Sequence, residues 1–358
     1  MTTTLFFPGG APESLEHVRR LQPTNTKAVG ASSIINDPAA ALYEDWEFLP
    51  FVTDAAFEDA FLALIKQKNI GSIFTRHPII SRYLKALITK HQLTVTLDTS
   101  DHFAATTIRY QQSIFAQLDT LLKTPFSLDI KNETPALNRL QQASLLSHAL
   151  RIDGQSSDEK IMALMEAARS CPKGDIIEIG SFWGRSAYVL ATLANHYGIG
   201  QLLCIDPWQN AAAHQDGVGE HVNAEARELD FESAFQGFQI NLMPHYGRVN
   251  YLRGQSHQLR HQYKLGFSVS SEAFGTTVYG GHIACLHIDG NHDLAHITHD
   301  IDDWMPLVVP GGWIIIDDYQ WAFGDGPQAA ADAWMKKNEA HVARAFVIGS
   351  ALFIKLKS

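Results

Sequence analysis

The sequence predicts a two-domain α/β protein, in which a Rossmann-like, doubly wound parallel sheet ending in an antiparallel hairpin follows a smaller α/β domain. Short apolar runs alternate with helical patterns along most of the chain, which is typical of parallel sheets joined by helices. Aspartates stand at the ends of several apolar runs beyond residue 170. A length of 358 residues corresponds to about two domains.

The composition indicates a folded chain. Hydrophobic residues make up 46% and charged residues 18%, which disfavours disorder. The formal charge of -10 argues against nucleic acid as a partner. Cys171, Cys204 and Cys285 lack the spacing of a zinc site or a disulfide framework. The N-terminal MTTTLFFPGG lacks a basic segment, and no apolar run spans a bilayer, so we expect a cytoplasmic protein without a membrane partner.

The first domain, residues 1–100, is predicted from alternating patterns. Strands are expected at 3–10, 26–32, 47–52, 71–75 and 92–97, and helices at 14–21, 55–69 and 79–91. This order loosely resembles the small α/β domain that precedes ATP-grasp domains. PGGAP has no phosphate-loop lysine, so we interpret the domain as an accessory. Residues 101–150 form a predicted helical connector, with helical spacing at 108–123 and 136–150.

The second domain, residues 151–358, begins with a helix. Ser156 and Glu159 match a capping box, and an apolar face follows at Ile161, Leu164, Met165 and Ala168. Strands are then expected at 175–180, 201–207, 249–255, 283–290 and 312–318, helices at 185–197, 231–243 and 297–305, and a hairpin at 344–357. The polar segment 211–229 is expected to be a substrate lid or a loop.

A glycine-bearing turn follows the strand that carries Glu178. Gly180 and Gly184 let a ligand approach the backbone. Their GxxxG spacing departs from the GxGxxG of dinucleotide sites, and any tight strand-to-helix turn can use glycine. Asp206 ends the next strand, where an acid of Rossmann-like folds meets ribose hydroxyls.

Residues 150–358 resemble class I S-adenosylmethionine-dependent methyltransferases. The resemblance lies in the motifs EIGSFWGRS, IDPW, RGQS, HIDGNH and PGGWIIIDDY. The chain looks most like the metal-dependent macrocin and mycinamicin O-methyltransferases, which methylate sugar hydroxyls. The resemblance implies S-adenosylmethionine as cofactor, with the 180–184 turn at its methionine part, Asp206 at the ribose, and Gln255 with Ser256 at the adenine. Many relatives carry an acid where this chain has Gln255. The cofactor-binding residues implied are Glu178, Gly180, Ser181, Trp183, Gly184, Ser186, Asp206, Trp208, Gln255 and Ser256.

Three further carboxylates are expected to converge on the same crevice. Asp289 closes one predicted strand, and Asp317 and Asp318 close its neighbour. Oxygen ligands suit Mg²⁺ or a similar divalent cation, and the resemblance places metal ligands at these three positions. Because side chains alternate along a strand, Asp317 and Asp318 can share an ion only if the chain bends there. Acids that merely line exposed strand ends are the alternative.

His292 lies three residues beyond Asp289, after a Gly-Asn turn signal. An imidazole can accept a proton near neutral pH, and the matching histidine is the general base in mycinamicin-type relatives. Asp289 is the rival base. His292, Asp293 and His296 also read as HDxxH, similar to zinc proteases, but that motif requires an intact helix.

We therefore expect an enzyme that transfers a methyl group to a hydroxyl of a sugar or glycosylated small molecule. The alternatives are an NAD(P)-dependent oxidoreductase and a non-catalytic cofactor-binding scaffold. Neither the acceptor nor the association of the chain with further copies of itself can be read from these residues.

Overall fold

The computed structural model describes residues 3–21, 27–99, 103–123, 134–216 and 218–358. The chain divides into two compact units, Met1–Ser113 and Ile114–Ser358, and the division falls within α4 (Phe103–Leu121). The boundary expected near residue 100 lies outside the described residues. Within the described ranges, no helix is long and apolar enough to cross a bilayer.

The first unit contains a five-stranded parallel sheet with the order β3-β2-β1-β4-β5. Its elements are β1 (Thr3–Phe6), α1 (Pro12–Leu21), β2 (Ala28–Ser32), the 3-10 helix η1 (Pro38–Leu42), β3 (Asp45–Phe48), α2 (Phe57–Gln67), β4 (Ile70–Phe74), α3 (Pro78–Lys90) and β5 (Thr96–Asp98). Phe57 and Phe61 of α2 are fully buried against the sheet residues Leu5 and Ile73. This burial is the reason why the strand-and-helix alternation of the sequence forms a sheet with its own core.

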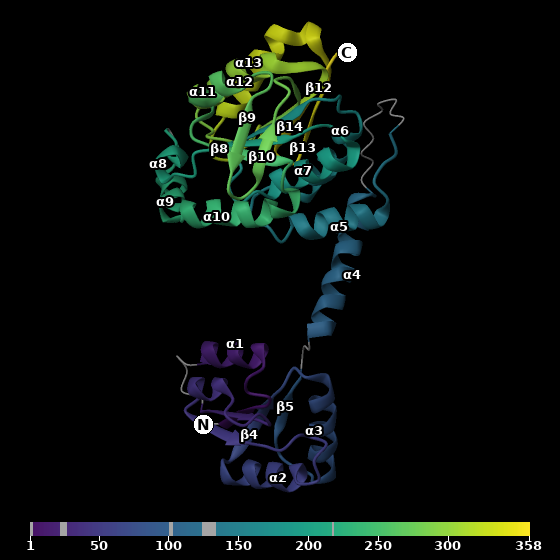
Figure 1. The fold of residues 1–358 in the computed structure, drawn as a ribbon, viewed down its shortest axis with the longest axis vertical. Helices are drawn as coiled ribbons and strands as arrows, with labels where there is room; N and C mark the ends of the chain where they lie inside the picture. The colour runs from purple at the N-terminus through teal and green to yellow at the C-terminus, as the bar shows by residue number, and fades with distance from the viewer. Residues whose placement is uncertain (1–2, 22–26, 100–102, 124–133, 217) are drawn as a thin grey trace. The chain divides into compact units, whose positions relative to one another are not determined.

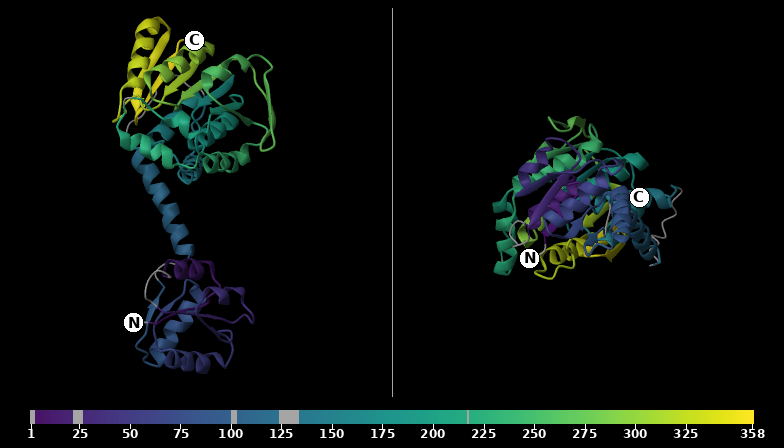
Figure 2. Two further views of the ribbon diagram at one scale, coloured as in Figure 1. Left: turned by 90° about the vertical axis from the view of Figure 1, so that its left-hand side faces the viewer. Right: turned by 90° about the horizontal axis from the view of Figure 1, so that it is seen from below.

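The second unit contains a seven-stranded sheet with the order β13-β14-β12-β11-β6-β7-β8, in which only the β14 pairings are antiparallel. Its strands are β6 (Asp175–Ile179), β7 (Leu202–Asp206), β8 (Val249–Arg253), β11 (Ile283–Ile288), β12 (Val308–Ile316), β13 (Val342–Ile348) and β14 (Ala351–Leu356). In Figure 2 the yellow strands of the C-terminal hairpin lie at one edge of this unit. The predicted doubly wound sheet with a terminal antiparallel hairpin is confirmed.

Helices cover both faces of this sheet (Figure 1). The longer helices are α5 (Arg139–Ala149), α6 (Asp158–Arg169), α7 (Arg185–Tyr197), α10 (Phe231–Leu242), α12 (Leu294–Trp304) and α13 (Gly326–Asn338). One apolar core contains residues of α5, α6, α7 and α10, and a second on the other face contains residues of α12 and α13. Strands buried on both faces read as continuous apolar runs, as 283–288 and 312–316 do.

Apart from shifted strand bounds in the first unit, the second unit differs from the sequence predictions in the following places. The helix α6 is capped by Ser157, whose side chain accepts from the Lys160 amide, so the capping box at Ser156 was wrong. The segment 211–229 contains most of α8 (Asn210–Ala213) and all of α9 (Glu220–Glu228). A two-stranded hairpin, β9 (Ser268–Ser271) and β10 (Gly275–Val278), was not predicted, because its strands have only four residues each and are rich in serine and threonine.

Candidate active site

The parallel strands of the second unit place their polar end residues along one edge of the sheet. Asp206 ends β7, and Gly180 follows β6. Asp289 follows β11, and Asp317 follows β12. The chain runs outward from β6 to β7 and β8 and then returns to β11 on the other side of β6. Ligands of open α/β sheets bind at such a reversal.

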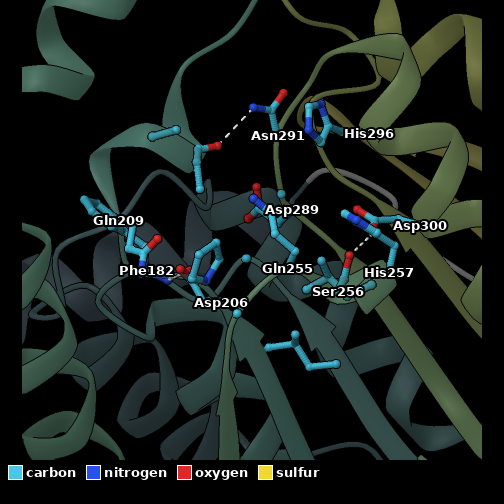
Figure 3. Close-up of a pocket in the computed structure, with 18 of the residues that line it drawn as sticks. Phe182, Asp206, Gln209, Gln255, Ser256, His257, Asp289, Asn291, His296 and Asp300 are labelled. Carbon is cyan, nitrogen blue, oxygen red and sulfur yellow. Dashed lines mark hydrogen bonds between the residues drawn. The ribbon is translucent and has the colours of Figure 1, made fainter. Parts of the chain in front are cut away.

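A pocket lies at this reversal (Figure 3). Its walls come from the ends of β6, β7, β8 and β11 and from α12. Its lining includes Gly180, Phe182, Asp206, Gln209, Gln255, Ser256, His257, Asp289, Asn291, His296 and Asp300.

The glycines of the first turn are required by close backbone approaches. Gly180 has a φ of +82°, and a Cβ there would overlap the carbonyl oxygen of Asp289. Gly184 has a φ of +89° at the start of α7, where a Cβ would meet Leu242. A side chain at either position would be strained. The turn after β6 therefore packs directly on the turn after β11.

Asp206 holds the glycine turn in place. Its Oδ2 accepts hydrogen bonds from the backbone amides of Ser181 at 2.8 Å and Phe182 at 2.9 Å. Its Oδ1 accepts from the amide of Trp208 at 2.6 Å. Burial raises the pKa of Asp206, and the three amide donors oppose that rise. The carboxylate thus positions the turn and also lines the pocket.

Glu178 lies beneath the turn instead of in the pocket lining. It is fully buried and pairs in register with His287 of β11. Its Oε1 lies 3.1 Å from His287 Nδ1, and its Oε2 accepts from the Ser181 hydroxyl at 2.6 Å. The hydrogen bond between Ser181 and Glu178 therefore stabilises the turn.

The remaining predicted residues of this turn pack behind it. Trp208 is buried against Phe235 and donates from Nε1 to the carbonyl of Phe182 at 2.8 Å. Trp183 accepts at its carbonyl from the side chain of Asn241 at 3.0 Å. Ser186 is buried in the first turn of α7. In the described part of the chain these three residues lie outside the pocket lining.

The other end of the pocket contains an acid that sequence reasoning missed. Asp300 of α12 is 4% exposed and accepts a hydrogen bond from the hydroxyl of Ser256. Burial raises the pKa of Asp300 to about 7. Figure 3 shows Ser256, His257 and Asp300 together at this end, with Gln255 nearer Asp289. The sequence pattern did indicate a buried acid here, because residue 300 has the helical spacing of the apolar face formed by Ile297, Ile301 and Trp304.

The three predicted metal ligands do not form one set. Asp289 lies with His292 and Asp318 in one group and with His287 and Asp317 in another, each group having its ligand atoms within 4.8 Å of one another. Asp318 has a φ of +49°, so the chain does bend after β12, as shared binding would require. Asp317 nevertheless points inward, with 7% of its side chain exposed, against 23% for Asp318.

Lys160 explains the inward position of Asp317. Its side chain is 2% exposed, its ammonium pairs with Asp317, and it lies 3.5 Å from Asp289 Oδ2. Although burial opposes it, the charge of Lys160 holds the pKa of Asp317 below its ordinary range. Burial and the charge of Asp317 raise the pKa of Asp289. Sequence analysis did not single out this lysine.

His292 lies beside the outer acid. Its Nε2 is 3.1 Å from Asp318 Oδ2, and its ring meets Trp321 edge-on with centroids 4.5 Å apart. Its Nδ1 has no hydrogen-bond partner among the described residues. The Nε2 side of the imidazole therefore faces the acid, and Nδ1 is buried.

The zinc-protease interpretation of HDxxH is wrong. The helix α12 begins at Leu294, with Asp293 as its N-cap. His292 therefore lies outside the helix and cannot share a helical face with His296, as that motif requires.

The acids and His292 fit a divalent cation. Asp289 and Asp318 offer oxygens that are partly exposed, and His292 offers a nitrogen in the same group. Close carboxylates without a cation repel one another. Carboxylate oxygens suit Mg²⁺ and Mn²⁺.

Part of the second unit matches a known family of protein domains. Residues 177–319 match the family model of a methyltransferase domain. The match begins inside β6 and ends just after Asp318, so it contains the strand ends that form the pocket but excludes Lys160. No curated protein matches the sequence.

Solved O-methyltransferases are similar at low identity. NovP is 14% identical with a TM-score of 0.44, over 70% of this chain and 98% of NovP. TomG from Streptomyces achromogenes is 14% identical with a TM-score of 0.39, over 68% of this chain and 96% of TomG. CalS11, a TDP-rhamnose 3'-O-methyltransferase, is 16% identical with a TM-score of 0.34, over 71% of this chain and 95% of CalS11.

Proposed function

We propose, from the premise that residues 177–319 form a methyltransferase domain, that this protein transfers a methyl group from S-adenosylmethionine to a hydroxyl oxygen. The acceptor we propose is a sugar or a glycosylated small molecule. The proposal depends on one observation: Asp289 lines the pocket and also belongs to the possible metal-ligand group with His292 and Asp318. A methyl donor in the pocket would thus lie beside groups that orient and deprotonate a hydroxyl.

We assign each part of the cofactor to a part of the pocket lining. The backbone of the turn at Gly180, which lines the pocket, would accommodate the methionine part. Asp206 has acceptor capacity beyond its three amide donors and would bind the ribose hydroxyls. Gln255, Ser256 and the buried Asp300 would contact the adenine.

Methyl transfer needs the loss of the hydroxyl proton. We assign this proton to the imidazole of His292, and the Asp318 carboxylate, 3.1 Å from Nε2, then stabilises the imidazolium. The acceptor oxygen forms a bond to the methyl carbon while the carbon–sulfur bond breaks, which leaves S-adenosylhomocysteine and an O-methylated product. A divalent cation held by Asp289 and Asp318 would lower the pKa of the hydroxyl. Asp289 and the turn that it packs on hold the two reactants in line.

Calorimetry with the full chain tests the cofactor assignment. S-adenosylmethionine and S-adenosylhomocysteine should bind, and NAD should not. Binding of NAD alone would instead favour the oxidoreductase. Incubation with methyl-labelled S-adenosylmethionine and a panel of glycosides should then place label on oxygen. Cofactor binding without transfer to any acceptor hydroxyl would favour a non-catalytic binding protein.

A further inference from the structure

We propose that Lys160 is the resident counter-ion of Asp317, and that it removes Asp317 from the metal-ligand set and confines a divalent cation to Asp289 and Asp318. This inference rests on the proposed function only in assuming that a cation binds at the acid cluster. It assigns a positioning role to a residue that precedes the matched methyltransferase segment.

The position of Lys160 on its helix is unusual for a lysine. It stands in the first turn of α6, three residues after the N-cap Ser157. Ala163, Leu164 and Ala167 follow at i+3, i+4 and i+7, and all are buried. The turn at Gly349 between β13 and β14 lies against Ser157 and Lys160. The ammonium therefore enters the protein interior from the core face of α6.

Burial of this ammonium requires compensating charge. An isolated charge is strongly disfavoured in the protein interior. Lys160 meets Asp317 in a direct ion pair and Asp289 at 3.5 Å. Glu178, the third acid near the ammonium, is occupied by His287 and Ser181. Asp317 is thus the principal partner of Lys160.

The same charge limits where a cation can bind. A divalent ion shared by Asp289 and Asp317 would lie next to the ammonium, and like charges repel strongly where water is scarce. Asp318 is more exposed than Asp317 and forms no ion pair with Lys160 among the described residues, and its Oδ2 lies 3.1 Å from His292 Nε2. With Asp317 in the direct ion pair with Lys160, the carboxylates left for a cation are Asp289 and Asp318, whose side chains are 26% and 23% exposed.

Mn²⁺ binding to the full chain, followed by calorimetry and by electron paramagnetic resonance, tests this assignment without measuring turnover. The main variant is K160M/D317N, which removes both charges of the pair together, since replacing a whole buried ion pair is often tolerated. We expect its Mn²⁺ dissociation constant to lie within about three-fold of wild type. D318N should weaken Mn²⁺ binding at least ten-fold. Asparagine tolerates the left-handed backbone at residue 318, so D318N should remain folded.

Single substitutions complete the test. K160M should bind Mn²⁺ at least ten-fold more tightly than wild type, because Asp317 then becomes available as a ligand, and K160R should restore the wild-type affinity. The control K355M removes another lysine of the second unit, whose ammonium bonds the carbonyls of Ser170 and Gly311. It should leave Mn²⁺ binding unchanged.

Two results would overturn the inference: a loss of Mn²⁺ affinity in K160M/D317N as large as that in D318N, or a wild-type chain that binds no Mn²⁺. Failure of the proposed function is measured separately, as absent S-adenosylmethionine binding or absent methyl transfer. The Mn²⁺ pattern across the variants does not depend on either of these.

Discussion

Asp300→Asn should change the pH dependence of stability. Burial raises the pKa of Asp300 from its ordinary value of 3.8 to about 7 in the folded protein, so the folded state binds the proton more tightly than the unfolded state. The stabilisation linked to this proton is complete below about pH 4 and is lost as the pH rises toward 7. A difference of about three pH units corresponds to about 4 kcal/mol in full, and to about 3 kcal/mol between pH 5 and pH 8.

Asparagine keeps the shape of the protonated acid but does not titrate. The free energy of unfolding of wild type minus that of Asp300→Asn should therefore fall by about 3 kcal/mol from pH 5 to pH 8. Urea unfolding followed by tryptophan fluorescence suits this measurement, because six of the seven tryptophans lie beyond residue 113. Asp302→Asn, at an exposed position of the same helix, controls for the loss of one charge. A difference that stays constant across this range would refute the buried, protonated state of Asp300.

The remaining predictions concern the cofactor, the cation, the base and the unit boundary. Asp206→Ala should weaken S-adenosylmethionine binding by about 1.5 to 3 kcal/mol in calorimetry, and unchanged affinity in a folded variant would remove the ribose assignment. Chelator should abolish methyl transfer while S-adenosylmethionine still binds, whereas full activity in chelator would contradict the metal role. His292→Ala should lower the rate about 10²- to 10⁴-fold while Mn²⁺ still binds, and loss of Mn²⁺ would make His292 a ligand. A chain starting at residue 103 should keep the thermal stability of the second unit. A chain starting at residue 135 lacks the buried Ile114 and Leu118, so its free energy of unfolding should be lower by at least about 2 kcal/mol. Equal melting temperatures of the two chains would contradict this.

The sequence was most informative where periodicity and burial agree. The helix α7 has the predicted bounds 185–197, because an apolar face and flanking glycines mark it on both sides. The strands of the second sheet read as apolar runs with acids at their ends, and this pattern also located Asp206 and Asp289. These features depend on residues adjacent in the chain, which a single sequence can reveal.

The features that were missed depend on contacts between distant segments. Lys160 meets an acid 157 residues away, and no local pattern states that a lysine on a helix will be buried. Asp300 likewise contacts Ser256 from another element. Asp317 and Asp318 follow the end of β12 in a turn, so strand alternation could not predict which of them points inward, and only the position of Lys160 shows why the inner acid is tolerated.

The left-handed backbone of Asp318 means that stability and the proposed function favour different residues at position 318. Its φ of +49° is a conformation that glycine or asparagine adopts with less strain, a difference of about 1 kcal/mol. A library screened only for survival at high temperature should therefore accumulate glycine or asparagine at position 318. Such variants would lack the carboxylate beside His292. The heat-resistant clones from this screen should therefore include many that have lost methyl transfer.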